Sequence, residues 1–158
     1  MKILFLHGKE SKPGGTKVKY LEEKGHIVVN PYLPNDDFVE STHIAQTAFE
    51  NEDPDIIVAS SRGGAVAMAM DTKQADVVLI APAWNHRDEL DIPKSVQYTS
   101  PSRAFILHCR EDEVVSYEDS EYLADVLGTK IIECGENHRM SDEDAVTTLS
   151  EIVDNCLK

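Results

Sequence analysis

Two kinds of segment alternate along the chain when its apolar and polar positions are compared. Short runs of apolar, β-branched residues predict strands at residues 2–7, 26–30, 55–60, 76–81, 103–109 and 130–133. Longer segments with apolar residues at helical spacing predict helices at residues 15–24, 42–50, 63–71, 117–127 and 142–158. We therefore expect an α/β fold, in which about six mostly parallel strands form one sheet with helices on both faces.

Residues between these segments support the expected boundaries. Gly25 and Gly128 follow two of the expected helices, and Ser141 with Asp144 forms an expected cap at the start of the last one. Residues 31–40 and 82–101 are rich in proline and charge, so we expect irregular loops there. Because no repeat or linker interrupts the chain, we expect its 158 residues to form a single domain.

Composition narrows the classes of function. The chain has 29 acidic against 15 basic residues and a net charge of −14, which opposes binding to nucleic acid or anionic membranes and slows the approach of highly anionic substrates. Its three cysteines lack C-x-x-C spacing and its apolar runs are too short to cross a bilayer, so we expect a cytoplasmic protein with reduced thiols. We expect no metal and no cofactor, and the sequence does not define an oligomeric state.

The segment from Ala59 to Gly64, Ala-Ser-Ser-Arg-Gly-Gly, has the form of a nucleophile elbow between a strand and a small-residue helix. Such a turn holds its serine in a strained conformation. The positions two before and two after it, here Ala59 and Gly63, are expected to be small because they nearly touch. Ser61 is therefore a candidate nucleophile, although a tight turn without chemistry has the same pattern.

A serine nucleophile needs a base to take its proton and a carboxylate to orient that base. Asp112 follows the strand expected at residues 103–109, and His138 follows the strand expected at residues 130–133. Because the carboxyl ends of parallel strands meet at one edge of a sheet, we expect both side chains near Ser61.

Four segments in this order resemble the α/β-hydrolase superfamily, and most of all its small bacterial serine esterases that lack a cap domain. They are Leu-Phe-Leu-His-Gly at 4–8, the elbow at 59–64, His-Cys-Arg-Glu-Asp-Glu-Val-Val at 108–115 and Gly-Glu-Asn-His at 135–138. By that resemblance Ser61 is the nucleophile, His138 is the general base and Asp112 is the acid that orients it. The chain order of these three residues is also that of the family.

The resemblance further implies an oxyanion hole made by two backbone N–H groups, those of Arg62 after the elbow and Lys9 after the first strand. We expect the Arg62 side chain to pair with a nearby acid or, alternatively, to bind a substrate carboxylate. His7 is expected to support the oxyanion loop without a chemical role of its own.

Two positions depart from the family pattern, since Ala59 and Cys109 stand where glycine is usual. The second departure leaves Glu111, a neighbour of Asp112, open as the acid. Trp84 is expected either to form a wall of the acyl pocket or to pack beneath the loop at 82–101. That loop is too short for a multi-helix cap, so we expect an open cleft.

Hydrolysis of a small or short-acyl carboxylic ester or thioester through an acyl-enzyme on Ser61 is the function that the resemblance implies. Esterase, thioesterase and peptidase activities are not separated by the sequence. The alternative is a non-catalytic α/β-hydrolase-fold protein that binds a small molecule or a partner. The glycine-rich residues 8–17 could cradle a phosphate, but nucleotide binding there is disfavoured, because their spacing fits neither the P-loop nor the dinucleotide-binding pattern.

Overall fold

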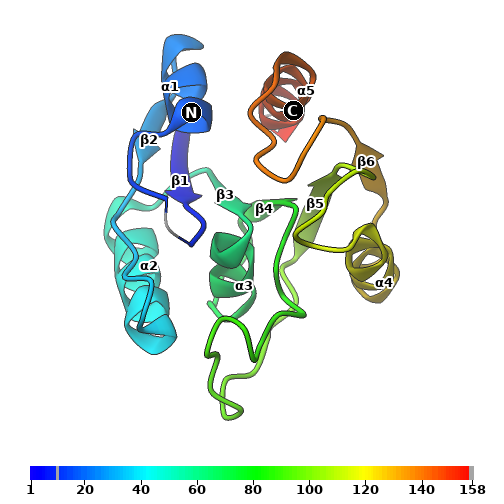
Figure 1. The fold of residues 1–158 in the computed structure, drawn as a ribbon. Coiled ribbons are helices and arrows are strands. Elements are labelled where there is room, and N and C mark those ends of the chain that lie inside the picture. Colours follow the sequence, from blue (N-terminus) through cyan, green and yellow to red (C-terminus); the bar gives the residue numbers. More distant parts are fainter. Residues whose placement is uncertain (10, 157–158) are drawn as a thin grey trace.

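A six-stranded parallel sheet forms the centre of the structure, a computed structural model that describes residues 1–9 and 11–156 (Figure 1). Its strands are β1 (Lys2–Leu6), β2 (Ile27–Val29), β3 (Ile56–Ser60), β4 (Asp76–Ile80), β5 (Arg103–His108) and β6 (Ile131–Glu133). The helices are α1 (Thr16–Glu23), α2 (Phe38–Glu52), α3 (Arg62–Met68), α4 (Tyr117–Leu127) and α5 (Glu143–Cys156). The expected α/β fold with six parallel strands is confirmed.

The strand order β2-β1-β3-β4-β5-β6 contains one point at which the chain changes direction across the sheet. From β1 the chain moves outward to β2, then returns to β3 on the other side of β1 and continues through β4 and β5 to β6. Leu6 at the end of β1 lies level with Ala59 near the end of β3. In open parallel sheets a ligand site commonly forms at such a point, outside the carboxyl ends of the strands.

Helices cover both faces of the sheet, as expected: α1 and α5 lie on one face, and α2, α3 and α4 lie on the other (Figure 1). Because both faces are covered, β3 is apolar along most of its length and all five of its residues are buried. Its side chains alternate, so Ile57 and Ala59 join the core beneath α2 and α3 while Ile56 and Val58 join the core beneath α1 and α5.

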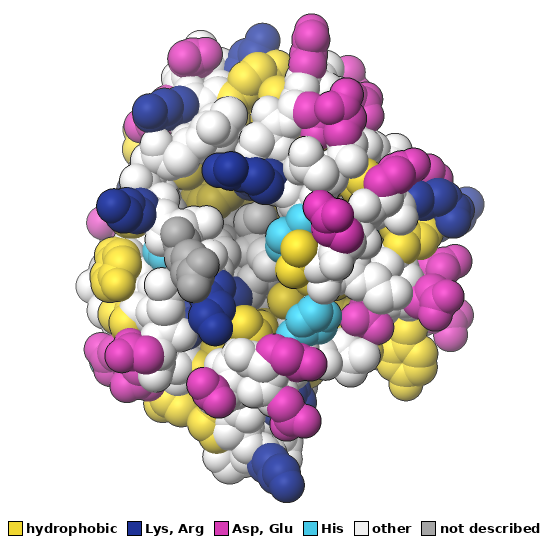
Figure 2. Space-filling view, viewed as in Figure 1, with side chains coloured by type: hydrophobic (Ala, Val, Ile, Leu, Met, Phe, Trp, Pro, Cys, Tyr) yellow, Lys and Arg dark blue, Asp and Glu magenta, His cyan; other side chains and the backbone are white. Residues whose placement is uncertain are grey.

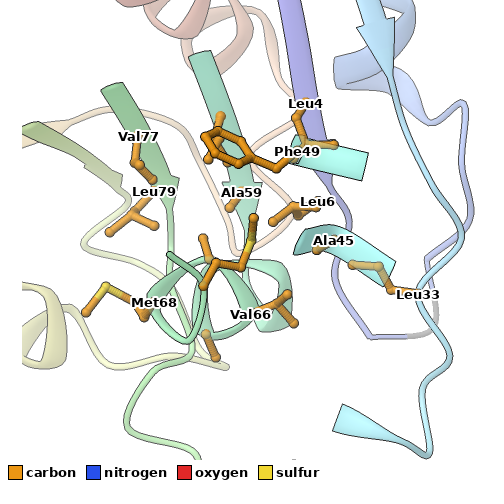
Figure 3. Packing of buried hydrophobic residues seen from close by; sticks show 14 of the residues in the cluster. Leu4, Leu6, Leu33, Ala45, Phe49, Ala59, Val66, Met68, Val77 and Leu79 are labelled. Carbon is orange, nitrogen blue, oxygen red and sulfur yellow. The ribbon is translucent and has the colours of Figure 1, made fainter. Parts of the chain in front are cut away.

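Gly63 and Gly64 let the start of α3 pack very close to its neighbours at the edge of the sheet. Val66 and Met68 of α3 lie against Leu6, Ala59 and Leu79 of the central strands (Figure 3). All residues of this seven-residue helix are buried. Since close-packed interiors move little, the start of α3 is held rigidly at the carboxyl edge of the sheet.

Helix α2 begins at Phe38, so the expectation that residues 31–40 form only a loop is wrong at its end. The cause is an N-cap: the Asp37 carboxylate accepts a hydrogen bond from the Glu40 N–H at 2.9 Å. An aspartate followed three residues later by a glutamate is typical of a helix start, and this signal precedes the expected helix by several residues.

Two other helix ends differ from expectation. Helix α5 is capped by Asp142, which accepts a hydrogen bond from the Ala145 N–H at 3.2 Å, in place of the expected cap by Ser141 and Asp144. Helix α3 ends at Met68, three residues earlier than expected. The expected helical ends at residues 157 and 158 lie outside the described residues.

The connection from β4 to β5, residues 81–102, is described throughout and contains neither helix nor strand. No cap of several helices is therefore built on it, as expected from its length. Within residues 1–9 and 11–156, no helix combines the length and apolarity needed to span a membrane.

Candidate active site

Ser61 lies at the turn between β3 and α3 with backbone torsions φ 53° and ψ −116°. A positive φ in a residue with a side chain costs roughly 1–3 kcal/mol and persists only where the surroundings enforce it. Here the Ser61 N–H donates to the Ile80 carbonyl at 2.9 Å, and the Ala83 N–H donates to the Ser61 carbonyl at 3.0 Å. The end of β4 and the loop that follows it thus bind both the N–H and the carbonyl of the strained residue.

Two glycines allow this turn to sit so close to its neighbours. A Cβ on Gly63 would lie 2.1 Å from the Leu6 carbonyl oxygen, and a Cβ on Gly64 would lie 2.7 Å from the Pro82 Cβ. A small residue at position 63 was expected, and the atoms nearest to an added Cβ there belong to the end of β1 and to His7.

Ser61, His138 and Asp112 are joined by hydrogen bonds in that order. The His138 Nδ1 lies 2.7 Å from Asp112 Oδ2 and its Nε2 lies 2.9 Å from Ser61 Oγ. Because a carboxylate only accepts, Nδ1 carries the proton, and Nε2 is left with a lone pair directed at the serine hydroxyl. The structure therefore brings all three predicted side chains together in the geometry of a nucleophile, a base and an orienting acid.

The side chain of Asp112 is fully buried and accepts several hydrogen bonds. Its Oδ1 accepts from the backbone N–H groups of Val114 and Val115, each at 2.8 Å, and its Oδ2 accepts from the rings of His138 and His108. Burial alone would raise the pKa of this carboxyl, but these donors together hold its pKa well below the ordinary value. Asp112 is therefore ionised at neutral pH.

Glu111, the open alternative for the acid, is directed elsewhere. Its carboxylate accepts from the Cys109 thiol at 3.2 Å, whereas the carboxylate of Asp112 faces His138. The cysteine that departs from the family pattern thus donates to Glu111, and the carboxylate that meets the base is that of Asp112.

His108 also belongs to the site, and no role was predicted for it. Its Nε2 lies 3.0 Å from Asp112 Oδ2 and 3.1 Å from the Val115 carbonyl, two acceptors that require the proton on Nε2. Its Nδ1 then accepts from the Ser120 hydroxyl at 2.6 Å. The available signal was a histidine that ends an apolar strand four residues before the acid.

His7 connects the loop after β1 to the loop after β2. Its Nε2 accepts from the Leu33 N–H at 2.9 Å, so its Nδ1 carries the proton and donates to the Gly8 carbonyl at 2.8 Å. Burial lowers the pKa of His7, which keeps the ring neutral. Gly8 packs directly against Ser61, since an added Cβ on Gly8 would lie 3.2 Å from the Ser61 Cβ.

Arg62 begins α3, and its side chain turns away from the serine. It is fully buried, and its Nη2 donates to the Pro34 carbonyl at 2.8 Å and to the Ser41 hydroxyl at 3.1 Å. Neither expectation for this side chain is met, since these partners are uncharged and Arg62 does not line the cavity beside Ser61. Burial lowers the pKa of its guanidinium, while the charges of Asp36 and Asp37 oppose that shift.

A cavity of about 600 Å³ opens beside Ser61 and His138. Lys9, whose N–H is a predicted oxyanion donor, lies in its wall. Figure 2 shows the cavity as a hollow near the centre of the face, with histidine and basic side chains around it. A small organic molecule fits a hollow of this size.

Trp84 does not line the cavity, so its prediction as a wall of the pocket is corrected. Its ring stacks on Tyr122, with centroids 5.7 Å apart, and its Nε1–H donates to the Asp119 carbonyl at 3.1 Å. Trp84 therefore joins the loop after β4 to α4, which is the packing role left open above.

Other chemistry has little basis in the described residues. Burial raises the pKa of the Cys109 and Cys134 thiols to about 11, so both are protonated and weakly nucleophilic. Within residues 1–9 and 11–156, no group of three or more His, Cys, Asp or Glu side chains is placed to hold a metal ion.

No family model matches the sequence, and no curated protein matches it. The structure is nevertheless similar to solved structures. Alpha/beta hydrolase domain-containing protein 10 from mouse has a TM-score of 0.76 at 18% identity, over 99% of this chain and 89% of that one. The ydeN gene product from B. subtilis has a TM-score of 0.74 at 12% identity, over 99% and 98%.

An esterase domain of a Rhodothermus marinus protein has a TM-score of 0.67 at 14% identity, over 96% of this chain and 83% of that one. At such low identities the similarity shows the fold alone. The chain has the α/β-hydrolase fold, as the four sequence segments implied.

Proposed function

We propose that this protein is a serine hydrolase that cleaves a small or short-acyl carboxylic ester or thioester through an acyl-enzyme on Ser61. The observation that carries the proposal is the set of hydrogen bonds from Ser61 Oγ to His138 and from His138 to Asp112, on a strained turn beside a cavity. Similar structures include a protein described as an esterase domain, which is consistent with hydrolysis.

Acylation begins when Ser61 Oγ attacks the ester carbonyl carbon and its proton passes to His138 Nε2. The resulting imidazolium is stabilised by the ionised Asp112 across a hydrogen bond of 2.7 Å. Negative charge develops on the former carbonyl oxygen, and we propose that the backbone N–H groups of Arg62 and Lys9 donate hydrogen bonds to it. Gly8 packs against Ser61, which supports a donor at the next residue.

The tetrahedral intermediate then collapses. The bond to the alkoxide or thiolate breaks, His138 Nε2–H protonates that leaving group, and the acyl group remains on Ser61 Oγ. In the second half, His138 takes a proton from water, the hydroxide oxygen attacks the acyl carbon, and Ser61 leaves with its proton restored. A carboxylic acid and an alcohol or thiol are the products.

A short acyl group is favoured by the absence of helices in the connection 81–102, which leaves the cavity open to solvent in the described structure. Nothing there forms a long enclosed tunnel for a fatty chain. We also propose a cytoplasmic location, supported by the free thiols at all three cysteines. Efficient turnover of emulsified long-chain lipid would contradict the short-acyl proposal.

Labelling with a fluorophosphonate probe, together with hydrolysis of 4-nitrophenyl acetate, tests the proposed function. We expect one label per chain and measurable turnover, both lost in Ser61→Ala. His138→Ala should lower kcat by several orders of magnitude, because the serine then has no base. Ser95→Ala is the matched control, since Ser95 is exposed and outside the cavity, and it should label normally.

An unlabelled protein, or turnover that persists in Ser61→Ala, would contradict the proposal. Circular dichroism of each variant separates a lost nucleophile from a lost fold. A folded protein that neither labels nor turns over would favour the non-catalytic alternative, a protein that binds a small molecule or partner through the same cavity.

A further inference from the structure

The cavity beside Ser61 is lined by basic side chains although the chain as a whole is strongly acidic. Lys9, Lys12, Lys17 and Arg139 lie in its wall, and Glu89 is the one acidic residue among the described residues that line it. The chain has 29 acidic residues against 15 basic ones, so a chance sample of side chains would favour acids. In Figure 2 basic side chains lie at the rim of the hollow together with histidines, and acidic side chains are spread over the rest of the same face.

Lys17 shows that this positive charge is not neutralised from within the protein. Its Nζ donates to the Arg139 carbonyl at 2.6 Å and to the Ser141 hydroxyl at 3.4 Å, both neutral acceptors. No carboxylate of the described residues lies within ion-pair distance of it. Burial, and then the positive charge of Arg139, lower the pKa of Lys17 to about 8. A nearby anion would remove this cost.

The backbone of the same wall adds donors. Helix α1 begins at Thr16 with Gly15 at its N-cap, so no side chain caps its first N–H groups. Gly15, Thr16 and Lys17 all line the cavity. Uncapped N–H groups at a helix start favour negative charge, in the same direction as the lysines. The described residues of the glycine-rich segment that fits no nucleotide motif thus contribute to the wall of the cavity.

We propose that the substrate carries an oxyanion group, a carboxylate or a phosphate, that lies between Lys12, Lys17 and Arg139 while its ester carbonyl meets Ser61. This inference rests on the proposed function and adds the substrate class. The net charge of the chain does not oppose this proposal, because a cleft lined by one sign of charge focuses its field locally and attracts a small anion even in an acidic protein.

Paired esters that differ in charge test the inference. We expect a higher kcat/KM for the 4-nitrophenyl monoester of adipate than for 4-nitrophenyl hexanoate, which has the same chain length without the carboxylate. For a charge on the leaving group, acetylated 3-hydroxyphenylacetate is compared with its methyl ester. The preference should decline between 20 mM and 300 mM NaCl, because salt screens the attraction over about 10 Å at 0.1 M.

The double variant Lys12→Gln/Arg139→Gln identifies the basic wall as the source. We expect the ratio of kcat/KM for the anionic ester to that for the neutral ester to fall about 10-fold, mainly through KM, on the basis that roughly 1.4 kcal/mol corresponds to tenfold. Lys73→Gln/Lys130→Gln is the matched control, because it removes two charges outside the cavity and should leave the ratio unchanged. An unchanged ratio in the double variant, or no preference in the wild type, would overturn the inference.

Binding to Ser61→Ala separates this inference from the proposed function. Monomethyl adipate and inorganic phosphate are titrated by NMR, and both affinities are measured again after Lys12→Gln/Arg139→Gln is added. Anion binding that weakens about 10-fold, combined with a wild-type protein that turns over no ester, would support the anion site and contradict the hydrolase. Turnover of neutral esters with no anion binding would do the reverse, and the stronger of the two ligands identifies carboxylate or phosphate.

Discussion

At the scale of single residues, the charge of Asp112 sets what the site can do. Two backbone N–H groups and two imidazole rings donate to its buried carboxylate, so it remains ionised although no solvent reaches it. An ionised Asp112 holds the His138 proton on Nδ1 and, in the mechanism that we propose, would stabilise the charge that His138 gains from Ser61. His108 contributes by donating to the same oxygen and by bonding Ser120 of α4 with its other ring nitrogen.

Replacing Asp112 by asparagine should therefore lower kcat about 10⁴-fold with little change in fold. The Val114 and Val115 N–H groups require the amide oxygen on their side, which turns the amide NH2 toward His138. His138 Nδ1 must then accept, its proton moves to Nε2, and Nε2 can no longer take the serine proton. Steady-state kinetics and NMR of the imidazole protons measure both effects. Glu111→Gln is the control, and an equal loss there would contradict the assignment.

Sequence reasoning could find Ser61, Asp112 and His138 because each follows a strand that the apolar pattern predicts, and parallel strands bring their ends together. His108 could not be given a role in the same way. Its partner Ser120 lies on α4, and which face of that helix meets β5 depends on tertiary packing. The direction of the Arg62 side chain likewise depends on the loop at Pro34, far away in sequence.

At the scale of elements, the distance between α3 and β1 decides whether the elbow can exist. Gly63 has no room for a side chain, since its Cβ would lie 2.1 Å from the backbone oxygen of Leu6. Backbone atoms of a central strand cannot move aside as a flexible side chain can. A side chain at position 63 would therefore require the whole of α3 or β1 to shift.

We expect Gly63→Ala to lower the free energy of unfolding by about 3 kcal/mol, at the upper end of the range for overpacking, and to reduce kcat further by displacing Ser61. Chemical denaturation followed by circular dichroism measures the first effect. The comparison is Gly15→Ala, where nothing lies within 4 Å of an added Cβ, and stability should change by less than about 1 kcal/mol. Equal losses in both variants would show that the close approach has no such cost.

The boundaries of helices and strands were predictable where they depend on local sequence, and were not where they depend on tertiary contacts. The strands and the glycine ends of the helices were predictable because apolar runs and left-handed positions are local features; Gly128 has φ 66° at the end of α4. The early start of α2 was readable from Asp37 and Glu40, but a proline-rich neighbourhood obscured it. The contact with β1 that requires glycine at position 63 could not be predicted from the sequence, since it joins α3 to a strand more than fifty residues earlier.

At the scale of the whole molecule, acidic residues outnumber basic ones along the chain, whereas basic residues outnumber acidic ones among the described residues that line the cavity. The net charge of −14 is evident from the sequence, whereas its distribution requires the fold. Acidic side chains repel one another across the surface, so the folded state carries an electrostatic cost that salt reduces. The few basic side chains of the cavity are too local to offset it.

Raising NaCl from 10 mM to 150 mM should therefore raise the Tm, because the screening length falls from about 30 Å to about 8 Å. A gain of about 1 kcal/mol corresponds to roughly 2–4 °C for a chain of this size. Chloride bound in the cavity would produce a similar rise, and Lys12→Gln/Arg139→Gln distinguishes the two causes. If surface repulsion dominates, the variant, which is more acidic, keeps the full salt-induced increase in Tm. If that increase disappears, chloride in the cavity is the cause and the screening argument fails.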